Sequence, residues 1–255
     1  MQIVAATQPL FSGRTMRRCV ALARDYLILP DRLHRWCVAG VIGMVMLLLA
    51  CFVMYAYVEK YHLTSSVFYG HLEYSFVDGG YPETFGYALE ITACMLFVLF
   101  AMAYGKRHWF AWAAILFVTF VDDAFKLHEN IGHVFAVAMH LEPAIGDLIG
   151  FAVTGLLPVI FWIAGARTIS NEEDLSAYLV FTGYFALLIL FGVGVDAMHG
   201  LVGKNGSQTV FTLFEDGGEL VTTAIITLSA FGMWLRQKNA VSDAAVSIDS
   251  ALPRP

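Results

Sequence analysis

Six long apolar stretches determine what this chain can fold into. They lie at about 36–58, 84–104, 109–131, 148–166, 176–196 and 209–235. Each is close to the ~20 residues that a helix needs to cross a hydrocarbon core of about 30 Å. With 58% hydrophobic and only 14% charged residues, the chain is also too apolar for a soluble domain of 255 residues. The sequence therefore predicts an all-α fold, a polytopic bundle of six transmembrane helices in a cell membrane, the inner membrane in a bacterium.

The six stretches fill residues 36–236 and leave two short flanks. Residues 1–35 hold six arginines and no short apolar core before a cleavage site, so we expect a basic cytoplasmic extension rather than a signal peptide. An interfacial helix is expected around residues 16–29. The tail, 237–255, is small and polar, which predicts disorder.

Lysine and arginine set the orientation, because basic residues beside short loops stay on the cytoplasmic side. With both termini cytoplasmic, twelve of the 15 basic residues lie on that side, and only Lys60, Lys126 and Lys204 lie outside. All five tryptophans then fall near cytoplasmic ends of spans, where indole rings are favoured.

The same orientation makes the outer face acidic. Fourteen of the 21 acidic residues fall there against three lysines, a net charge of −11, although the whole chain carries only −6. Six of the eight histidines lie on that side too. Such a face repels nucleic acid and attracts metal cations, protons or basic partners.

Several ionisable groups fall within the spans, where they are costly and usually functional. In the third span Asp122, Lys126, Glu129, His133 and His140 share one stripe of a continuous helix, whereas His128 points elsewhere unless the helix breaks near Gly132. Asp122 is about 20 Å along the helix from Trp109, below the outer interface. A simple Asp122–Lys126 pair is the alternative interpretation.

Three other spans carry ionisable groups at the same depth: Glu90, then Asp196 with His199, then Glu219. Glu215 and Asp216 lie one turn before Glu219, where the helix dipole alone favours acids. Isolated charges in lipid would be prohibitive, so we expect one interior pocket open to the outer face.

Acids and imidazoles together are the ligand chemistry of divalent Zn, Mn or non-haem Fe. The predicted ligands are Glu90, Asp122, Asp123, Glu129, His133, Asp196, His199 and Glu219, with His128, Lys126, Glu215 and Asp216 beside them. Paired Glu-x-x-His motifs of di-metal bundles are absent, as are nucleotide and haem signatures. The four cysteines show neither a disulfide pattern nor a thiolate site.

Three functions fit this pocket. One is a metal-dependent hydrolase or oxidoreductase that acts on a membrane lipid or lipid-like substrate, with Glu219, Glu129 or Asp123 as catalytic residues. Another is a transporter coupled to a cation or proton. The third is a membrane assembly or partner-binding protein. Few polar residues continue inward from the pocket, which favours the enzyme over the transporter.

Overall fold

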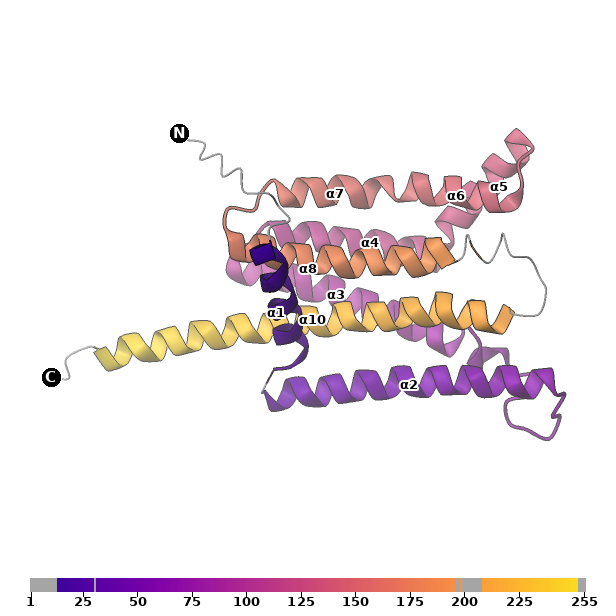
Figure 1. Ribbon diagram of the computed structural model, residues 1–255, viewed down its shortest axis with the longest axis horizontal. Helices are drawn as coiled ribbons and strands as arrows, with labels where there is room; N and C mark the ends of the chain where they lie inside the picture. The colour runs from indigo at the N-terminus through magenta and orange to yellow at the C-terminus, as the bar shows by residue number, and fades with distance from the viewer. Residues whose placement is uncertain (1–12, 30, 196–197, 199–207, 252–255) are drawn as a thin grey trace.

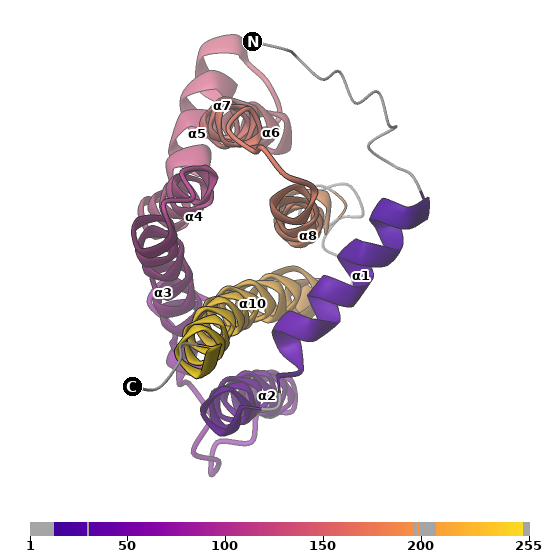
Figure 2. The same ribbon diagram turned by 90° about the vertical axis from the view of Figure 1, so that its left-hand side faces the viewer.

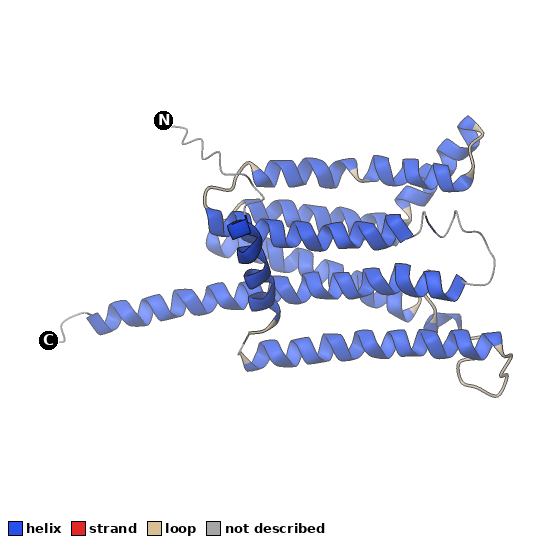
Figure 3. Ribbon diagram, viewed as in Figure 1, coloured by secondary structure: helices blue, strands red, loops and turns tan. Residues whose placement is uncertain are grey.

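The computed structural model describes residues 13–29, 31–195, 198 and 208–251, which form helices and loops with no strand among them (Figures 1 and 3). Six helices are long and apolar enough to cross a membrane: Arg32–Lys60, Tyr81–Tyr104, His108–Phe125, Ile145–Ala166, Glu172–Val195 and Thr209–Ala244. Each overlaps one of the six stretches predicted from the sequence. The all-helical fold with six such helices is thereby confirmed.

The long helices run up and down in chain order (Figure 1). α1 (Gly13–Leu27) precedes α2 (Arg32–Lys60), and a loop with the short η1 (Leu72–Tyr74) leads to α3 (Tyr81–Tyr104) and α4 (His108–Phe125). α5 (Leu127–Met139) and α6 (Pro143–Thr154) form a hairpin that continues into α7 (Leu156–Ala166). α8 (Glu172–Ile189) ends in the π-helical turn η2 (Leu190–Val195), and α10 (Gln208–Ala251) is last.

Local chemistry explains several helix ends. The carboxylate of Asp31 accepts a hydrogen bond from the His34 amide at 3.0 Å and caps α2. Asn171 caps α8 in the same way through the Asp174 amide, at 2.8 Å. Gly105, at a φ of 67°, ends α3 in the left-handed conformation that glycine adopts without strain. These three positions set where the first and fifth spans begin and where the second span ends.

The tightest packing lies in the half of the bundle near α1. It consists of an aromatic cluster, which we define as Phe97, Trp109, Trp112, Tyr178 and Phe181, contributed by α3, α4 and α8. The rings of Phe97 and Trp109 stack with centroids 5.4 Å apart, and the Phe181 ring meets Phe97 edge-on at 4.9 Å. Because lipid is as apolar as these side chains, it is their close packing that holds the helices together.

α1 lies across the start of α8 and crosses α10 near Gly232, beyond which α10 continues (Figures 1 and 2). Its Leu22 and Tyr26 are buried against the bundle, while Arg17 and Arg24 are exposed on the other face. It contains most of the helix expected around residues 16–29. α10 does not stop where the sequence predicts a disordered tail at residue 237, since its helix continues to Ala251. That segment holds several alanines and no proline or glycine, which explains why a helix is allowed there.

The predicted continuous helix through the third span is wrong. α4 ends at Phe125, and Lys126 adopts a left-handed conformation with a φ of 51°, from which α5 starts in a new direction. The Asp122 carboxylate accepts a hydrogen bond from the His128 amide at 2.8 Å and so stabilises the new start. Asp122, Glu129, His133 and His140 therefore do not share one stripe. The break falls at Lys126 rather than near Gly132.

Two more irregularities lie close to the α4–α5 break. α6 and α7 are separated by an interruption at Gly155, one turn before Pro158, which has no N–H to donate to the Thr154 carbonyl. The second irregularity is at the end of α8, which changes to a π-helix over Leu190–Val195. Such turns widen a helix locally and are frequent at functional sites.

Three glycines let α5 and α6 cross closely. A Cβ on Gly132 or Gly146 would press on the backbone of the other helix, and a Cβ on Gly150 would overlap the carbonyl oxygen of His128. The position of His128 therefore depends on glycine at position 150.

We predict that Gly150→Ala lowers the melting temperature of the detergent-purified protein. The new methyl group forces α5 away from α6, at a cost of about 1–3 kcal/mol. Gly183→Ala on α8 is the matched control, because nothing lies within 4 Å of its Cβ. That helical alanine should leave stability unchanged or raise it. Equal melting curves for Gly150→Ala and wild type would contradict the close crossing.

Candidate metal site

A cavity of about 960 Å³ lies in the half of the bundle away from α1. Its walls come from α3, α4, α5, α6, α7, α8 with η2, and α10. The three irregular segments described above all border it, because Lys126, Gly155 and Gly192 are among its lining residues. Breaks in three helices thus open the space that continuous packed helices would fill.

The cavity gathers most of the residues that the sequence singles out. Ten of them line it: Glu90, Asp122, Asp123, Lys126, His128, Glu129, His133, Glu215, Asp216 and Glu219. Asp196 and His199 lie outside the described residues, so their part in the site stays a prediction. The single shared pocket expected from the sequence is therefore present for these ten residues.

Asp122, Asp123 and His128 form the centre, because each offers a ligand atom and these atoms all lie within 4.8 Å of one another. His128 is brought there by the break at Lys126. Its Nδ1 lies 3.3 Å from Oδ2 of Asp122 but is not aligned for a hydrogen bond. Within the described part of the chain, no other three acidic, histidine or cysteine side chains converge so closely.

Neighbouring side chains hold two members of this centre in place. The Thr154 hydroxyl donates to Oδ2 of Asp122 at 3.1 Å. The Phe151 ring stacks on the His128 imidazole, with centroids 3.8 Å apart and planes 15° apart. Neither the Thr154 hydrogen bond nor the Phe151 stacking was predicted from the sequence. Pro158 is the one sequence signal nearby, because it marks the helix interruption next to Thr154.

His128 titrates under two opposing influences. Burial alone would lower the pKa of its imidazole, but the adjacent Asp122 carboxylate and the charges of Asp123 and Glu129 outweigh burial. The pKa of His128 consequently lies above its ordinary value. This is the electrostatic signature of a site that attracts positive charge, whether a proton or a metal ion.

Glu90 extends the centre on the α3 side. Its side chain is only 4% exposed, and the carboxyl group of Asp123 acts on it electrostatically. The carboxylate oxygen Oε2 of Glu90 is buried without a hydrogen-bond partner. Two buried carboxyl groups that interact in this way are stable together only if they share a proton, or if a cation balances their charge. An unsatisfied oxygen beside them is the group that a cation would satisfy.

Glu219 approaches from α10 because η2 has a glycine opposite it. A Cβ on Gly192 would overlap the Glu219 carboxylate, so only glycine leaves room for this acid. Glu219 also acts electrostatically on Glu90. Glu215 and Asp216 lie nearer the helix start and are half-buried.

Glu129 and His133 lie at the rim instead of the centre, and both are exposed. The sequence placed Glu129 and His133 beside Asp122 and pointed His128 away from it. In the structure His128 lies beside Asp122, and Glu129 and His133 do not. Lys126 closes this rim by binding Asp78 at 2.6 Å and Glu129 at 3.6 Å. The hydrogen bond to Asp78 is the main reason that the pKa of Lys126 lies above its ordinary value.

Fold and site together define a helical protein of membrane-spanning type with a polar cavity built into one half of its bundle. The chain belongs to the family described as "Domain of unknown function (DUF8692)", which it matches over residues 44–235. That match contains every residue that lines the cavity and excludes α1. Searches of curated proteins and of solved structures gave no match.

We predict that Glu90→Gln raises thermal stability in metal-free buffer. The amide keeps the shape of the side chain but removes one of several crowded buried carboxyl groups, a gain of about 1 kcal/mol or more. The same variant should gain less stability than wild type when Zn²⁺ or Mn²⁺ is added. A lower melting temperature without metal would show that the Glu90 charge is compensated within the protein itself.

Proposed function

We propose that this protein is a divalent-metal-dependent hydrolase of the cell membrane, acting on a lipid or lipid-like substrate. In this proposal both termini are cytoplasmic and the cavity opens to the outer face, as the lysine and arginine distribution predicts. The six spans support the part of the proposal that puts both ends of the bundle on one side.

One observation carries the metal assignment: ligand atoms of Asp122, Asp123 and His128 converge within 4.8 Å, beside the unpartnered Oε2 of Glu90. Three carboxylates and an imidazole suit Zn²⁺, Mn²⁺ or Fe²⁺. No cysteine lines the cavity, so soft thiolate-seeking metals are not favoured. Thr154 and Phe151 orient the ligands, as supporting groups around metal sites commonly do.

Hydrolysis is the proposed reaction because water is its only co-reactant. A divalent ion at this site would lower the pKa of a bound water and polarise a carbonyl group. The water oxygen forms a bond to the carbonyl carbon of an ester or amide, and the bond to the leaving oxygen or nitrogen breaks. Glu219 accepts the proton from water and returns it to the leaving group.

The floor of the cavity supports an enzyme over a transporter. Below Glu90 on α3 lie Ala93 and Phe97, both 0% exposed, and below Thr119 on α4 lie Leu116 and Ile115, at 1% and 0%. The aromatic cluster fills the space beyond them. A transporter needs access from both sides of its binding site, whereas a hydrolase needs only one entrance.

We predict that Asp122→Asn, Asp123→Asn and His128→Gln each weaken metal binding by about tenfold or more, because each removes one ligand. The measurement is the ratio of metal to protein, determined by elemental analysis after loading with Zn²⁺ or Mn²⁺ and gel filtration. His133→Gln is the matched control: this histidine also lines the cavity but lies outside the converging group. Wild-type metal content in all three ligand variants would overturn the assignment.

We predict that Glu219→Gln keeps the fold and the bound metal but loses turnover by about 10²–10⁴-fold, because the amide cannot accept a proton. Hydrolysis would be followed on a panel of lipid esters and amides. Glu215→Gln, one turn earlier on α10, is the control and should retain activity. Undiminished turnover in Glu219→Gln would remove this residue as the base.

A further inference from the structure

α7 and α8 both line the cavity, but each packs mainly on other helices. The two helices are joined near one end, where the Trp162 indole donates to the Thr182 hydroxyl at 2.9 Å and the Tyr178 hydroxyl donates to the Trp162 carbonyl at 2.8 Å. Beyond this junction they separate: α7 packs along α4, whereas α8 packs on α10 and α1 (Figure 2). This junction closes the gap at its Trp162 end, which is the end nearer to α1.

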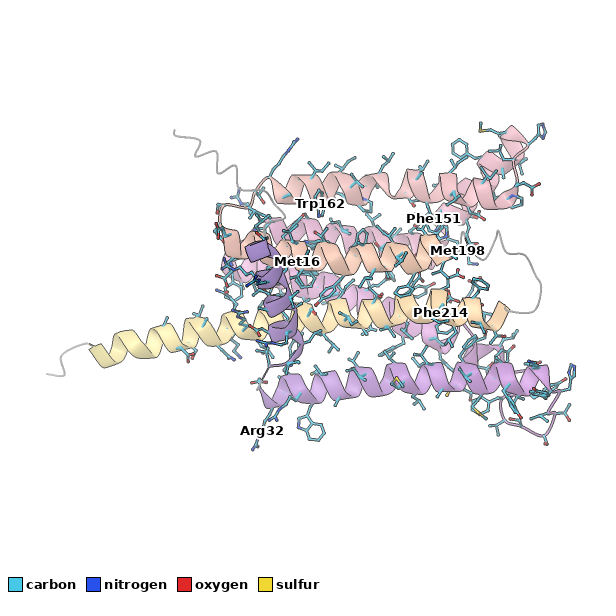
Figure 4. The ribbon with its side chains drawn as sticks, viewed as in Figure 1. Met16, Arg32, Phe151, Trp162, Met198 and Phe214 are labelled. Carbon is cyan, nitrogen blue, oxygen red and sulfur yellow. The ribbon has the colours of Figure 1, made fainter. Side chains whose placement is uncertain are left out.

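The walls of this gap are apolar. α7 contributes Pro158 and Val159, and α8 contributes Phe185, Leu188 and Ile189. Val159 and Ile189 line the cavity and are 54% and 48% exposed, so no neighbouring helix covers either side chain. Phe151 and Trp162, labelled in Figure 4, mark the two ends of the α6–α7 wall. From Gly155 to Trp162 this wall rises about 10 Å.

Polarity changes along the cavity. At its other end, near Gly155, the apolar gap leads to Thr154 on α6 and Asp122 on α4, which are hydrogen-bonded to each other. A ligand that fits such a space has an apolar tail beside α7 and α8 and a reactive polar group at the carboxylates. α6 with α7, and α8 with η2, are each long and apolar enough to span a membrane, so in a membrane this gap would face lipid.

Charge selects among lipids. Ten carboxylates and one lysine line the cavity, so a surplus of negative charge persists even beside a divalent ion. A phosphate or carboxylate head group would be repelled, whereas an ammonium group would be attracted. Two aromatic residues, Tyr87 and Phe76, are among the lining residues, and aromatic rings are compatible with such a cation.

We infer that the α7–α8 gap admits the acyl chain of a lipid whose head group carries an ammonium and no net negative charge. This inference rests on the proposed function for the position of the reactive group. It adds the route of entry and the class of head group, and it assigns Val159 and Ile189 as residues that determine whether the chain can enter.

Photocrosslinking tests this in liposomes of digalactosyldiacylglycerol, whose head group carries neither an ammonium nor a phosphate and so does not compete with the probes. Two single-chain probes carry the same photoactivatable group on the chain, one with an ammonium head and one with a phosphate head, and mass spectrometry locates the adducts. We expect the ammonium probe to label residues of the gap and the phosphate probe to label them at least tenfold less. Val159→Trp and Ile189→Trp should each reduce labelling of the gap at least fivefold.

Ile160→Trp and Leu187→Trp are the matched controls. These neighbours are 56% and 43% exposed but do not line the cavity, so their variants should be labelled in the gap like wild type. Labelling spread evenly around the bundle, or equally reduced by variants and controls, would overturn the entry route. Equal labelling by both probes would overturn the choice of head group.

The readout separates this inference from the metal assignment, because crosslinking requires no turnover. Gap labelling in a protein that binds no metal would retain the lipid route and reject the hydrolase. Metal binding that depends on Asp122, together with no labelling of the gap, would do the reverse.

Discussion

The Asp122 carboxylate is the point on which the site depends. One of its oxygens accepts the His128 amide and the other accepts the Thr154 hydroxyl, so a single side chain connects the break after α4 with the break before α7. A continuous helix would satisfy these backbone regions by itself, and the polar space would close. Because Asp122 is itself buried, its charge has to be balanced by groups nearby.

The surroundings explain how that balance is reached without filling the cavity. His128 places its imidazole 3.3 Å from the Asp122 carboxylate, and Lys126 binds Asp78 and Glu129 at the rim. Glu90 adds a further buried acid with one oxygen unpartnered. Packing alone would favour apolar residues at these positions, since buried charges rarely stabilise a fold. Their presence is therefore better explained by what the cavity binds.

The sequence predicts structure well where the signal extends over many residues or recurs on several helices. Spans of about 20 apolar residues are unmistakable, and acids at one depth on several spans predict a shared cavity. It failed at Lys126, because a lysine in the left-handed conformation has no glycine or proline to announce the helix end, and the compensating contacts come from distant residues. The error pointed His128 away from the centre, where it belongs, and placed Glu129 and His133 too deep. The role of Thr154 was not predicted, because it depends on a tertiary contact with Asp122.

The aromatic cluster and the cavity occupy opposite halves of one bundle, and this has a consequence for variation. Ring stacking among Phe97, Trp109 and Phe181 secures the helices without help from the polar residues. The cavity half can accept altered ligands or a reshaped gap while the other half keeps the helices in register. Such a division gives the fold room to change its chemistry while its architecture stays the same.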